Sequence, residues 1–326
     1  MNYKILGKDL KVSAVGLGCM GFSHAYGAPT EINEAIRTIR SAYTMGYNFF
    51  DTAECYVGAC ADGTLSFNEE LVGRALKDVR GDVVIATKFG VKHEGRHLLT
   101  DSRPEVIIRS VDGSLKRLKT DHIDLYYQHR IDPNVSAEEV ASVMADLIKE
   151  GKITHWGISE ANEEYLRRAN AVCPVTAIQN RYSMMYRSYE RLFPVLEELK
   201  VGFVAFSPLA NGVLSAAYNS DSKFEEKGDY RADMPQFQPQ AYEQNTDLFA
   251  MLKSLAERYS ATPAQISLAW MMNKKPYIVP IPGSRKEARI RENGGAAEIK
   301  LTKEEVALID DALDRVNMSE VFGGHK

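Results

Sequence analysis

Val83-Val84-Ile85-Ala86-Thr87-Lys88 is a short apolar run that ends in a cation, and similar runs recur along the chain. A continuous apolar run of this length is typical of a strand that is buried on both faces of a parallel sheet. Asn48-Phe49-Phe50-Asp51 and Leu125-Tyr126-Tyr127-Gln128-His129 have the same form, with an ionisable residue directly after the apolar part. The pattern predicts parallel strands whose ends carry chemically active side chains.

Amphipathic segments separate these runs. The predicted strands span Ala14–Gly18, Asn48–Asp51, Val83–Thr87, Leu125–Gln128, His155–Ser159, Ala177–Asn180, Phe203–Ser207 and Ile278–Ile281. Helical periodicity predicts helices at Glu31–Met45, Asn68–Leu76, Pro104–Leu118, Ala137–Lys149, Glu163–Asn170 and Glu190–Leu199. Alternation of strands and helices indicates a parallel α/β sheet, and eight strands with covering helices predict a (β/α)8 TIM barrel. We expect a single domain over residues 1–326, because barrels commonly exceed the usual domain size.

A doubly wound sheet is the competing fold. Gly16-Leu17-Gly18-Cys19-Met20-Gly21 has glycines at the spacing of its dinucleotide-binding fingerprint. That fingerprint also requires an acidic residue roughly 20 residues further on, at the end of a second strand. Asp51 comes later than that position and belongs to the chemical set instead. We therefore favour the barrel and interpret the glycines as a tight first turn.

Two regions depart from the alternation. Tyr3–Lys11 precedes the first strand and is expected to form a small hairpin that closes the barrel floor. Ser215–Gln244 is too long for a plain connection, so we expect a functional lid. Phe89, Arg130 and the tail Met318–Lys326 are candidates for shaping the substrate mouth, with long loops at the C-terminal face of the barrel.

Composition excludes several classes of partner. The net charge is −4, and acidic and basic residues alternate without a Lys/Arg-rich run, so a nucleic-acid partner is not expected. No signal-peptide stretch and no long apolar segment is present, which predicts a cytoplasmic protein without a membrane partner. Cys19, Cys55, Cys60 and Cys173 lack metal-ligand spacing, so we expect no metal site and reduced thiols. A redox role for Cys55 or Cys60 stays open.

Asp51, Tyr56, Lys88 and His129 form the candidate catalytic set. In a barrel the carboxyl ends of all strands open on one face, so residues far apart in sequence meet there. A phenol with a pKa of about 10 is a poor acid, but a neighbouring cation favours its phenolate. Lys88 would tune Tyr56, Asp51 would hold Lys88, and His129 would orient a carbonyl oxygen by a hydrogen bond. Taken singly, each residue has an ordinary structural explanation; together they predict the proton donor of a carbonyl reduction.

At these residues the chain resembles the aldo-keto reductase superfamily, and the resemblance runs nearly end to end. The motifs that carry it are Phe50-Asp51-Thr52-Ala53-Glu54-Cys55-Tyr56, Ala86-Thr87-Lys88-Phe89, Asp124-Leu125-Tyr126-Tyr127-Gln128-His129, Gly157-Ile158-Ser159-Glu160, Ile178-Gln179-Asn180, Phe206-Ser207-Pro208-Leu209, Ile281-Pro282-Gly283-Ser284-Arg285 and Arg289-Ile290-Arg291-Glu292-Asn293. The resemblance implies Tyr56 as general acid, Lys88 and Asp51 as its tuning pair, and His129 as the orienting group.

The resemblance also implies NADP(H), bound extended across the barrel mouth and supplying the hydride. Phe206 would stack under the nicotinamide, and Ser159 and Gln179 would bind its carboxamide. A third contact is in doubt because Glu160 stands where well-known members carry asparagine, and Asn162 is an open substitute. The other implied cofactor residues are Ser207, Leu209, Asn211 and Gly212 at the pyrophosphate, Gly283, Ser284, Arg285 and Arg289 toward the 2′-phosphate, and Glu292 and Asn293 at the adenine.

The alternative for Arg285 and Arg289 is a solvated helix face, since they are four residues apart. We favour phosphate recognition, because guanidinium groups suit phosphate oxygens.

The leading hypothesis is an NADP(H)-dependent reductase of small-molecule aldehydes or ketones. One alternative is a lyase that forms a Schiff base on Lys88. Another is a non-catalytic, cofactor-binding regulatory subunit. The sequence leaves the physiological substrate, its stereochemistry, the direction of reaction and the oligomeric state open.

Overall fold

The computed structural model describes residues 1–94 and 97–322. At its centre lie eight hydrogen-bonded parallel strands. They are β3 (Leu17–Gly18), β4 (Phe49–Asp51), β7 (Val84–Phe89), β10 (Ile123–Gln128), β11 (Ile153–Ser159), β12 (Ala177–Arg181), β13 (Gly202–Phe206) and β14 (Ile278–Pro280). The sheet closes on itself, because Gly18 forms a parallel bridge with Gly283 and the N–H of Gly16 donates to the carbonyl of Pro280 at 2.9 Å. The predicted TIM barrel is confirmed.

The glycine-rich segment lies at this closing seam. A Cβ on Gly18 would stand 2.7 Å from the carbonyl oxygen of Ile281, so only glycine lets the two strands approach. The predicted first strand, Ala14–Gly18, is regular only over β3. Ala14 and Gly16 instead donate backbone hydrogen bonds to Asn2 and Pro280.

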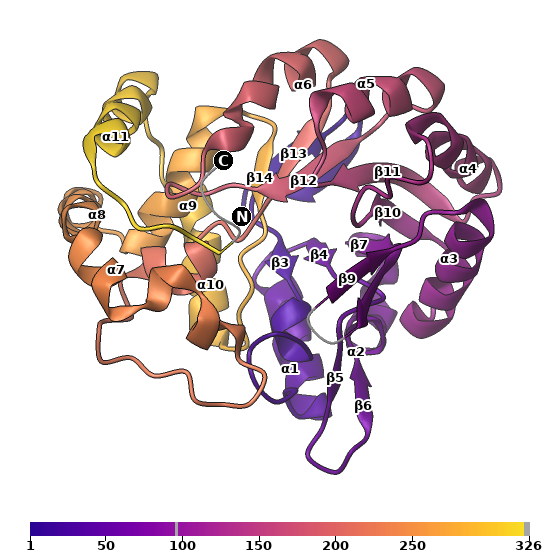
Figure 1. The fold of residues 1–326 in the computed structure, drawn as a ribbon, viewed down its shortest axis with the longest axis horizontal. Coiled ribbons are helices and arrows are strands. Elements are labelled where there is room, and N and C mark those ends of the chain that lie inside the picture. The colour runs from indigo at the N-terminus through magenta and orange to yellow at the C-terminus, as the bar shows by residue number, and fades with distance from the viewer. Residues whose placement is uncertain (95–96, 323–326) are drawn as a thin grey trace.

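Helices surround the strands in a ring (Figure 1). They include α1 (Ile32–Thr44), α2 (Asn68–Leu76), α3 (Pro104–Leu118), α4 (Ala137–Lys149), α5 (Glu163–Val172) and α6 (Phe193–Leu199). The prediction of one helix over Glu190–Leu199 is wrong in its first part, where Ser188–Leu192 form a 3-10 turn, η3. The α-helix begins at Phe193 because Pro194 suits a first turn, where no amide donor is needed.

Several elements were not predicted. They are the helices α7 (Pro239–Gln244), α8 (Thr246–Arg258), α9 (Pro263–Lys274), α10 (Glu287–Gly295) and α11 (Lys303–Arg315), and the hairpins β5–β6 (Val57–Ala59, Leu65–Phe67) and β8–β9 (Val91–Glu94, His97–Thr100). Two of them carried a sequence signal. Capping boxes at Thr262 with Gln265, and at Thr302 with Glu305, begin α9 and α11.

The predicted N-terminal hairpin is present as β1 (Tyr3–Leu6) and β2 (Leu10–Ser13). Leu6, Leu10 and Val12 are buried against the inward side chains of the barrel. In Figure 1 this indigo hairpin lies behind β12 and β13. The ammonium of Lys4 donates to the carbonyls of Met272 at 2.7 Å and Ile278 at 2.9 Å, which ties the hairpin to the α9–β14 connection. The hairpin therefore closes the barrel floor, as predicted.

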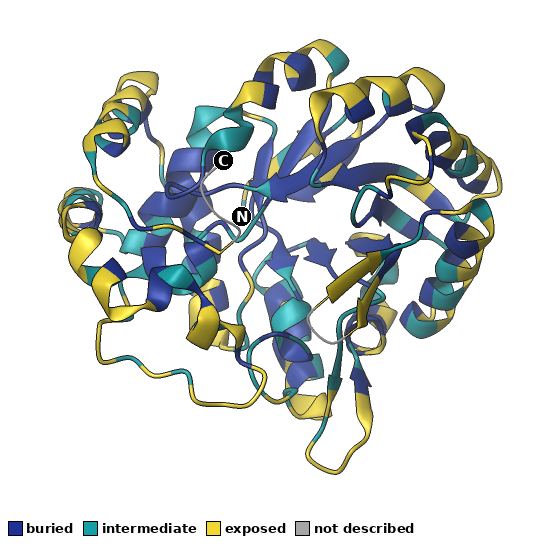
Figure 2. Ribbon diagram, viewed as in Figure 1, coloured by how far each residue is buried: buried dark blue, intermediate teal, exposed yellow. Residues whose placement is uncertain are grey.

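Alternate residues of each strand point into the barrel. The inward set packs as a core of its own and comprises Phe49, Val84, Ala86, Leu125, Tyr127, Ala177, Val204, Val279 and Ile281. The outward residues pack against the helices in a second, larger core. Figure 2 shows this division, with buried strands and inner helix faces in dark blue and exposed outer faces in yellow.

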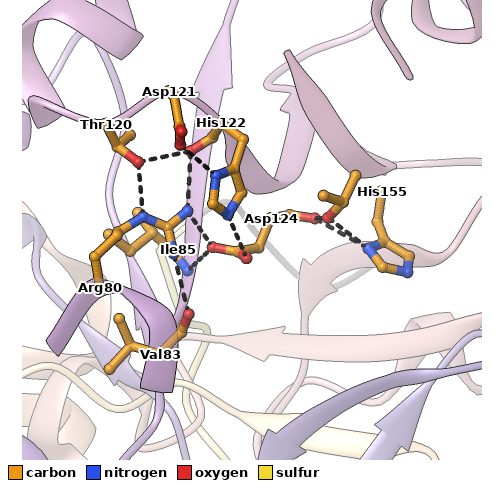
Figure 3. A network of polar contacts seen from close by, with 9 residues as sticks. Arg80, Val83, Ile85, Thr120, Asp121, His122, Asp124 and His155 are labelled. Carbon is orange, nitrogen blue, oxygen red and sulfur yellow. Dashed lines mark hydrogen bonds and ion pairs between the residues drawn. The ribbon is translucent and has the colours of Figure 1, made fainter. Parts of the chain in front are cut away.

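A polar network ties together the starts of β7, β10 and β11, at the opposite end of the strands from the candidate catalytic set (Figure 3). The guanidinium of Arg80 lies 2.7 Å from Oδ2 of Asp124, and that oxygen also accepts the backbone N–H of Ile85 at 2.8 Å. Arg80 further donates to the hydroxyl of Thr120 and to the carbonyl of His122. The Asp124 carboxylate therefore joins β7 to β10, and the hydroxyl of Thr154 on β11 donates to the backbone carbonyl of Asp124 at 2.8 Å.

The segment Ser215–Gln244 folds as turns that lead into α7. It includes the 3-10 turns η5 (Tyr230–Asp233) and η6 (Pro235–Phe237). Asp229 forms a bridge with Tyr26 of the loop after β3, so the segment reaches across the barrel mouth. Its function as a lid stays a prediction.

All four cysteines are free thiols. In the parts of the chain that the structure describes, no helix has both the length and the apolar character that crossing a bilayer requires. Of the predicted substrate-mouth tail, residues 323–326 lie outside the described residues.

Candidate active site

Strand alternation brings the predicted catalytic residues together. Asp51 follows Phe49 on the inward face of β4, and Lys88 follows Val84 and Ala86 on the inward face of β7. Asp51 and Lys88 are both buried, so two opposite charges are enclosed at the end of an otherwise apolar barrel core. His129, directly after β10, is 8% exposed.

The ammonium of Lys88 has a partner for each of its three N–H bonds. It lies 2.5 Å from Oδ1 of Asp51 and donates to the carbonyl of Thr52 at 2.7 Å. Its third neighbour is the hydroxyl of Tyr56, at 3.4 Å. Burial opposes the charge on Lys88, but Asp51 and Tyr56 outweigh burial and hold the pKa of Lys88 above its ordinary value. Lys88 is therefore a fixed cation beside the phenol.

The pKa of Tyr56 reflects two opposing influences. Burial raises it to about 12, while the ammonium of Lys88 acts in the opposite direction. The sequence suggested the influence of the cation but not the larger effect of burial. At neutral pH Tyr56 is therefore a protonated phenol, which is the form that donates a proton.

His129 lies edge-on to Tyr56, with ring centroids 5.8 Å apart and planes at 83°. Burial lowers the pKa of His129 well below its ordinary value, and Arg130 and Lys88 act in the same direction. Nδ1 of His129 lies 3.5 Å from Sγ of Cys55. Because burial raises the pKa of the Cys55 thiol to about 12, the thiol keeps its proton and can donate it to Nδ1. That arrangement leaves Nε2–H free as a donor to a carbonyl oxygen.

Gln179 and Ser159, expected to bind the nicotinamide carboxamide, both have protein partners. The side-chain amide of Gln179 donates to Oδ2 of Asp51 at 2.6 Å. The hydroxyl of Ser159 accepts from the guanidinium of Arg130 at 3.0 Å. Gln179 thus holds the second oxygen of Asp51, a contact that the sequence analysis missed. Its inward position two residues after Ala177 on β12 was the available signal.

Neither open candidate for a third carboxamide contact is free of protein partners. Glu160 has a positive φ of 54°, and its carboxylate accepts from the hydroxyl of Tyr189 at 2.6 Å. Asn162 caps α5 by accepting the backbone N–H of Tyr165.

A nicotinamide dinucleotide fits the groups at the end of β13. Phe206 is half-buried and offers an aromatic ring there. After it, Ser207, Asn211 and Gly212 have positive φ values of 49°, 59° and 112°. Within this turn the N–H groups of Ala210 and Gly212 donate to the carbonyls of Ser207 and Leu209 at 2.9 Å each, so an anion would bind the remaining N–H groups of the turn. Leu209 is half-buried at the start of this turn, which is η4 (Ala210–Ser215).

The predicted 2′-phosphate residues follow β14. Gly283 is part of the barrel seam, and the hydroxyl of Ser284 accepts the N–H of Lys286 at 3.1 Å. Arg285 precedes α10, so it is not on a shared helix face with Arg289. Its guanidinium donates to the carbonyls of Tyr26 at 2.9 Å and Ala28 at 3.0 Å, across the barrel mouth.

Arg289 lies in the first turn of α10 with its side chain 47% exposed, and its guanidinium pairs with Glu292 at 2.6 Å. Asn293 is buried on the same helix. The structure thus brings Arg289, Glu292 and Asn293 to one short helix. It gives Arg285 a separate contact with the loop after β3.

The chain is similar to proteins of known family and structure. Residues 14–314 match the model of the aldo/keto reductase family. The chain is 37% identical to probable aldo-keto reductase 1 from Glycine max, over 97% of this chain and 89% of that protein. It is 38% identical to an aldo-keto reductase from Strobilurus tenacellus, over 93% of this chain and 89% of that protein. The structure of a glycerol dehydrogenase from Gluconobacter oxydans matches with a TM-score of 0.84 at 29% identity, covering 96% of this chain and 95% of that one.

Proposed function

Because this chain belongs to the aldo/keto reductase family and is an oxidoreductase of carbonyl compounds, we propose that it reduces small-molecule aldehydes or ketones to alcohols with NADPH. The proton comes from Tyr56 in this proposal. The observation that carries it is the ammonium of Lys88, which is buried, held by Asp51 and Thr52, and directed at the hydroxyl of Tyr56.

The protein residues divide the chemistry between them. Bound NADPH supplies the hydride. Tyr56 donates its phenolic proton to the carbonyl oxygen as negative charge develops there, and Lys88 stabilises the phenolate that remains. His129 is neutral, so it serves as a hydrogen-bond donor that orients the carbonyl rather than as a charged acid. Gln179 and Lys88 together keep Asp51 in place.

NADPH is proposed over NADH because of the basic groups after β14. Arg289 is partly exposed at the start of α10, where a 2′-phosphate can compete with Glu292 for its guanidinium. The carboxylate of Glu292 would turn to the adenine. The positive-φ turn after Phe206 suits the pyrophosphate, and the ring of Phe206 suits the nicotinamide.

A Schiff-base lyase is less well supported. Its lysine must be a neutral nucleophile. Lys88 is instead held as a cation by Asp51, and each of its N–H bonds has a partner. A non-catalytic, cofactor-binding subunit would keep the fold without turnover, so measurement of turnover decides between that alternative and an enzyme. We also propose a cytoplasmic location, which is consistent with four free cysteines.

The direct test is loss of NADPH absorbance with a panel of aldehydes and ketones, in the parent and in Tyr56→Phe. The variant keeps the ring but loses the proton donor, so kcat/KM should fall by at least about 10²-fold. NADPH binding, followed by fluorescence quenching, should persist because the hydroxyl lies outside the proposed dinucleotide path. Activity of the variant within about threefold of the parent would remove Tyr56 from this role.

A further inference from the structure

Two arginines stand beside the ring of Phe206. Arg130 follows His129 directly, and Arg181 is the last residue of β12. Their guanidinium carbons lie 5.9 Å and 5.6 Å from the centroid of that ring. Both side chains are half-buried at the end of the barrel where Lys88 and His129 also lie. Two cations thus border the place where a carbonyl held by Tyr56 and His129 would sit.

Arg130 has only uncharged partners in the described part of the chain. Its Nη1 nitrogen, which carries two N–H bonds, donates to the carbonyl of His129 at 2.6 Å and to the hydroxyl of Ser159 at 3.0 Å. Since a guanidinium carries five N–H bonds, several remain available in a fixed, forked geometry. Arg130 also acts on the pKa of both Tyr56 and His129, which is consistent with a position close to them.

Arg181 is held mainly by aromatic rings. Its guanidinium carbon lies 5.3 Å from the ring centroid of Tyr186 and 5.7 Å from that of Phe322, and it donates to the carbonyl of Phe322. The carboxylate of Glu160 raises the pKa of Arg181 but forms no ion pair with it within residues 1–94 and 97–322. That carboxylate instead accepts a hydrogen bond from the hydroxyl of Tyr189. The partners of Arg181 are therefore aromatic rings and a carbonyl, whereas a guanidinium cation binds an anion more strongly.

Several other partly buried arginines of this protein are paired with carboxylates. Arg117 lies 2.5 Å from a carboxylate oxygen of Glu69, and Arg187 pairs with Asp314. A partly buried cation without a carboxylate loses hydration that its surroundings replace only in part. An anionic ligand would supply the missing partner through charge-assisted, two-pronged hydrogen bonds.

Building on the proposed function, we propose that the substrates of this enzyme are carbonyl compounds that carry a carboxylate, which Arg130 and Arg181 bind. The carbonyl lies between Tyr56 and His129, and the carboxylate lies toward the two guanidinium groups. The reaction is unchanged, because the carboxylate takes no part in hydride or proton transfer and only fixes the substrate.

Cofactor phosphate is the other anion that could bind arginines here. The segments that suit phosphate, Ser207–Gly212 and Ser284–Arg289, follow β13 and β14. Arg130 and Arg181 come from the ends of β10 and β12, on either side of β11. Arg130 also adjoins the proposed carbonyl-orienting residue. We therefore assign the two guanidinium groups to substrate. Measuring the NADPH dissociation constant beside the acid-to-ester preference separates the two sources.

The test compares 3- and 4-formylbenzoate with their methyl esters, using NADPH absorbance to obtain kcat/KM. The two isomers place the carboxylate at two distances from the same aldehyde. An ester withdraws electrons more strongly than a carboxylate, so intrinsic reactivity favours the ester. We expect the parent to prefer at least one acid over its ester by roughly tenfold or more, because the charge-assisted bonds favour the acid.

Arg181→Gln should lower this acid-to-ester ratio by roughly tenfold, mainly through KM for the acid. Arg187→Gln is the matched control: it removes a nearby arginine that is already paired with Asp314, and the ratio should stay at the parent value. Circular dichroism and thermal unfolding establish that both variants fold. NADPH dissociation constants are measured by fluorescence quenching for both.

Two outcomes overturn the assignment. One is equal kcat/KM for acids and esters in the parent. The other is an unchanged ratio in Arg181→Gln, and a higher NADPH dissociation constant in that variant would then assign Arg181 to cofactor phosphate. In each case NADPH consumption with the esters would still support the carbonyl reductase, whereas no consumption with any aldehyde would count against the proposed function itself.

Discussion

At the scale of single residues, Lys88 governs how readily Tyr56 exchanges its proton. Burial raises the pKa of the phenol to about 12, and the ammonium 3.4 Å away opposes that rise. Reduction uses the protonated phenol, which is present below this pKa and is lost as pH rises through it. Alcohol oxidation uses the phenolate, so its rate should rise with pH until the same pKa is reached.

Lys88→Met should therefore raise the pKa of Tyr56 further. Between pH 7 and 10 the phenolate fraction falls about tenfold for each added pKa unit, so alcohol oxidation should slow by at least that factor. Its rising limb should move to higher pH. Reduction should also slow, because a weaker acid donates its proton less readily. Profiles of kcat/KM against pH, recorded in both directions, measure the shift.

The control for this prediction is Asp51→Asn in the Lys88→Met background. Without Lys88, Asp51 would be a buried carboxylate with Gln179 as its remaining partner. The double variant removes that charge as well, so the two profiles should agree if the missing ammonium is the cause. An oxidation profile of Lys88→Met that coincides with the parent profile would rule out the tuning role.

At the scale of elements, the first turn of α10 should determine the choice of dinucleotide. Arg289→Ala should raise the dissociation constant of NADPH by roughly one to two powers of ten, because one charge-assisted contact to the 2′-phosphate is lost. Binding of NADH should barely change, since NADH has no such phosphate. Titration by fluorescence quenching measures both constants, and added salt should weaken the preference for NADPH.

Arg291→Ala is the matched control, because Arg291 is an exposed arginine on the same helix. It removes the same charge two positions away and should leave the ratio of the two constants close to the parent value. If NADPH and NADH affinities fall together in Arg289→Ala, Arg289 belongs to the solvated face of α10 and the cofactor assignment loses its main support.

The N-terminal hairpin is the element that fills the barrel floor. Leu6 is fully buried against the inward core, whereas Ile5 on the same strand is 46% exposed. Leu6→Ala should lower the free energy of unfolding by about 2–5 kcal/mol, the usual cost of a cavity in a packed core. Ile5→Ala should change it by less than about 1 kcal/mol. Urea unfolding of both variants measures the difference, and equal values would mean that the hairpin does not seal the core.

At the scale of the whole molecule, we expect one end of the barrel to determine catalysis and the other end to contribute to stability. Asp124 joins Arg80 to the backbone of β7 at the strand starts (Figure 3). Lys88 lies near the other end of β7. Asp124→Ala leaves the backbone N–H of Ile85 without its acceptor and removes the carboxylate from the partly buried guanidinium of Arg80, which keeps its uncharged acceptors. The free energy of unfolding should fall by about 1–3 kcal/mol, a range that allows for partial screening by solvent.

The same variant should keep kcat/KM within about twofold of the parent at a temperature well below unfolding, because no catalytic contact changes. Tyr56→Phe is its counterpart, with activity lost and stability kept. Thermal unfolding and steady-state kinetics on the two variants test the separation. A large loss of kcat/KM in folded Asp124→Ala would show that the strand starts influence the catalytic end.

The sequence by itself determined the barrel and the positions of its chemical residues. Apolar runs that end in Asp51, Lys88 and His129 are local patterns, and the period of two along a strand fixes which side chains face inward. Since parallel strands run in the same direction, their carboxyl ends lie on one face of the barrel regardless of the conformation of the loops. The helices α2, α3 and α4 were predictable for a similar reason, because their boundaries follow from local periodicity, with a proline in the first turn of α3 and a Ser136 cap before α4.

Only the tertiary structure decided the partners of those residues. Gln179 bonds to Asp51, and Arg285 bonds to the loop after β3, through contacts between segments that no local pattern relates. The elevated pKa of Tyr56 likewise depends on burial by distant parts of the chain. Residues Ser188–Leu192 form η3 where helix was predicted, directly before α6 with Pro194 in its first turn. Periodicity is a property of neighbours in sequence, whereas desolvation and hydrogen-bond pairing are properties of neighbours in space.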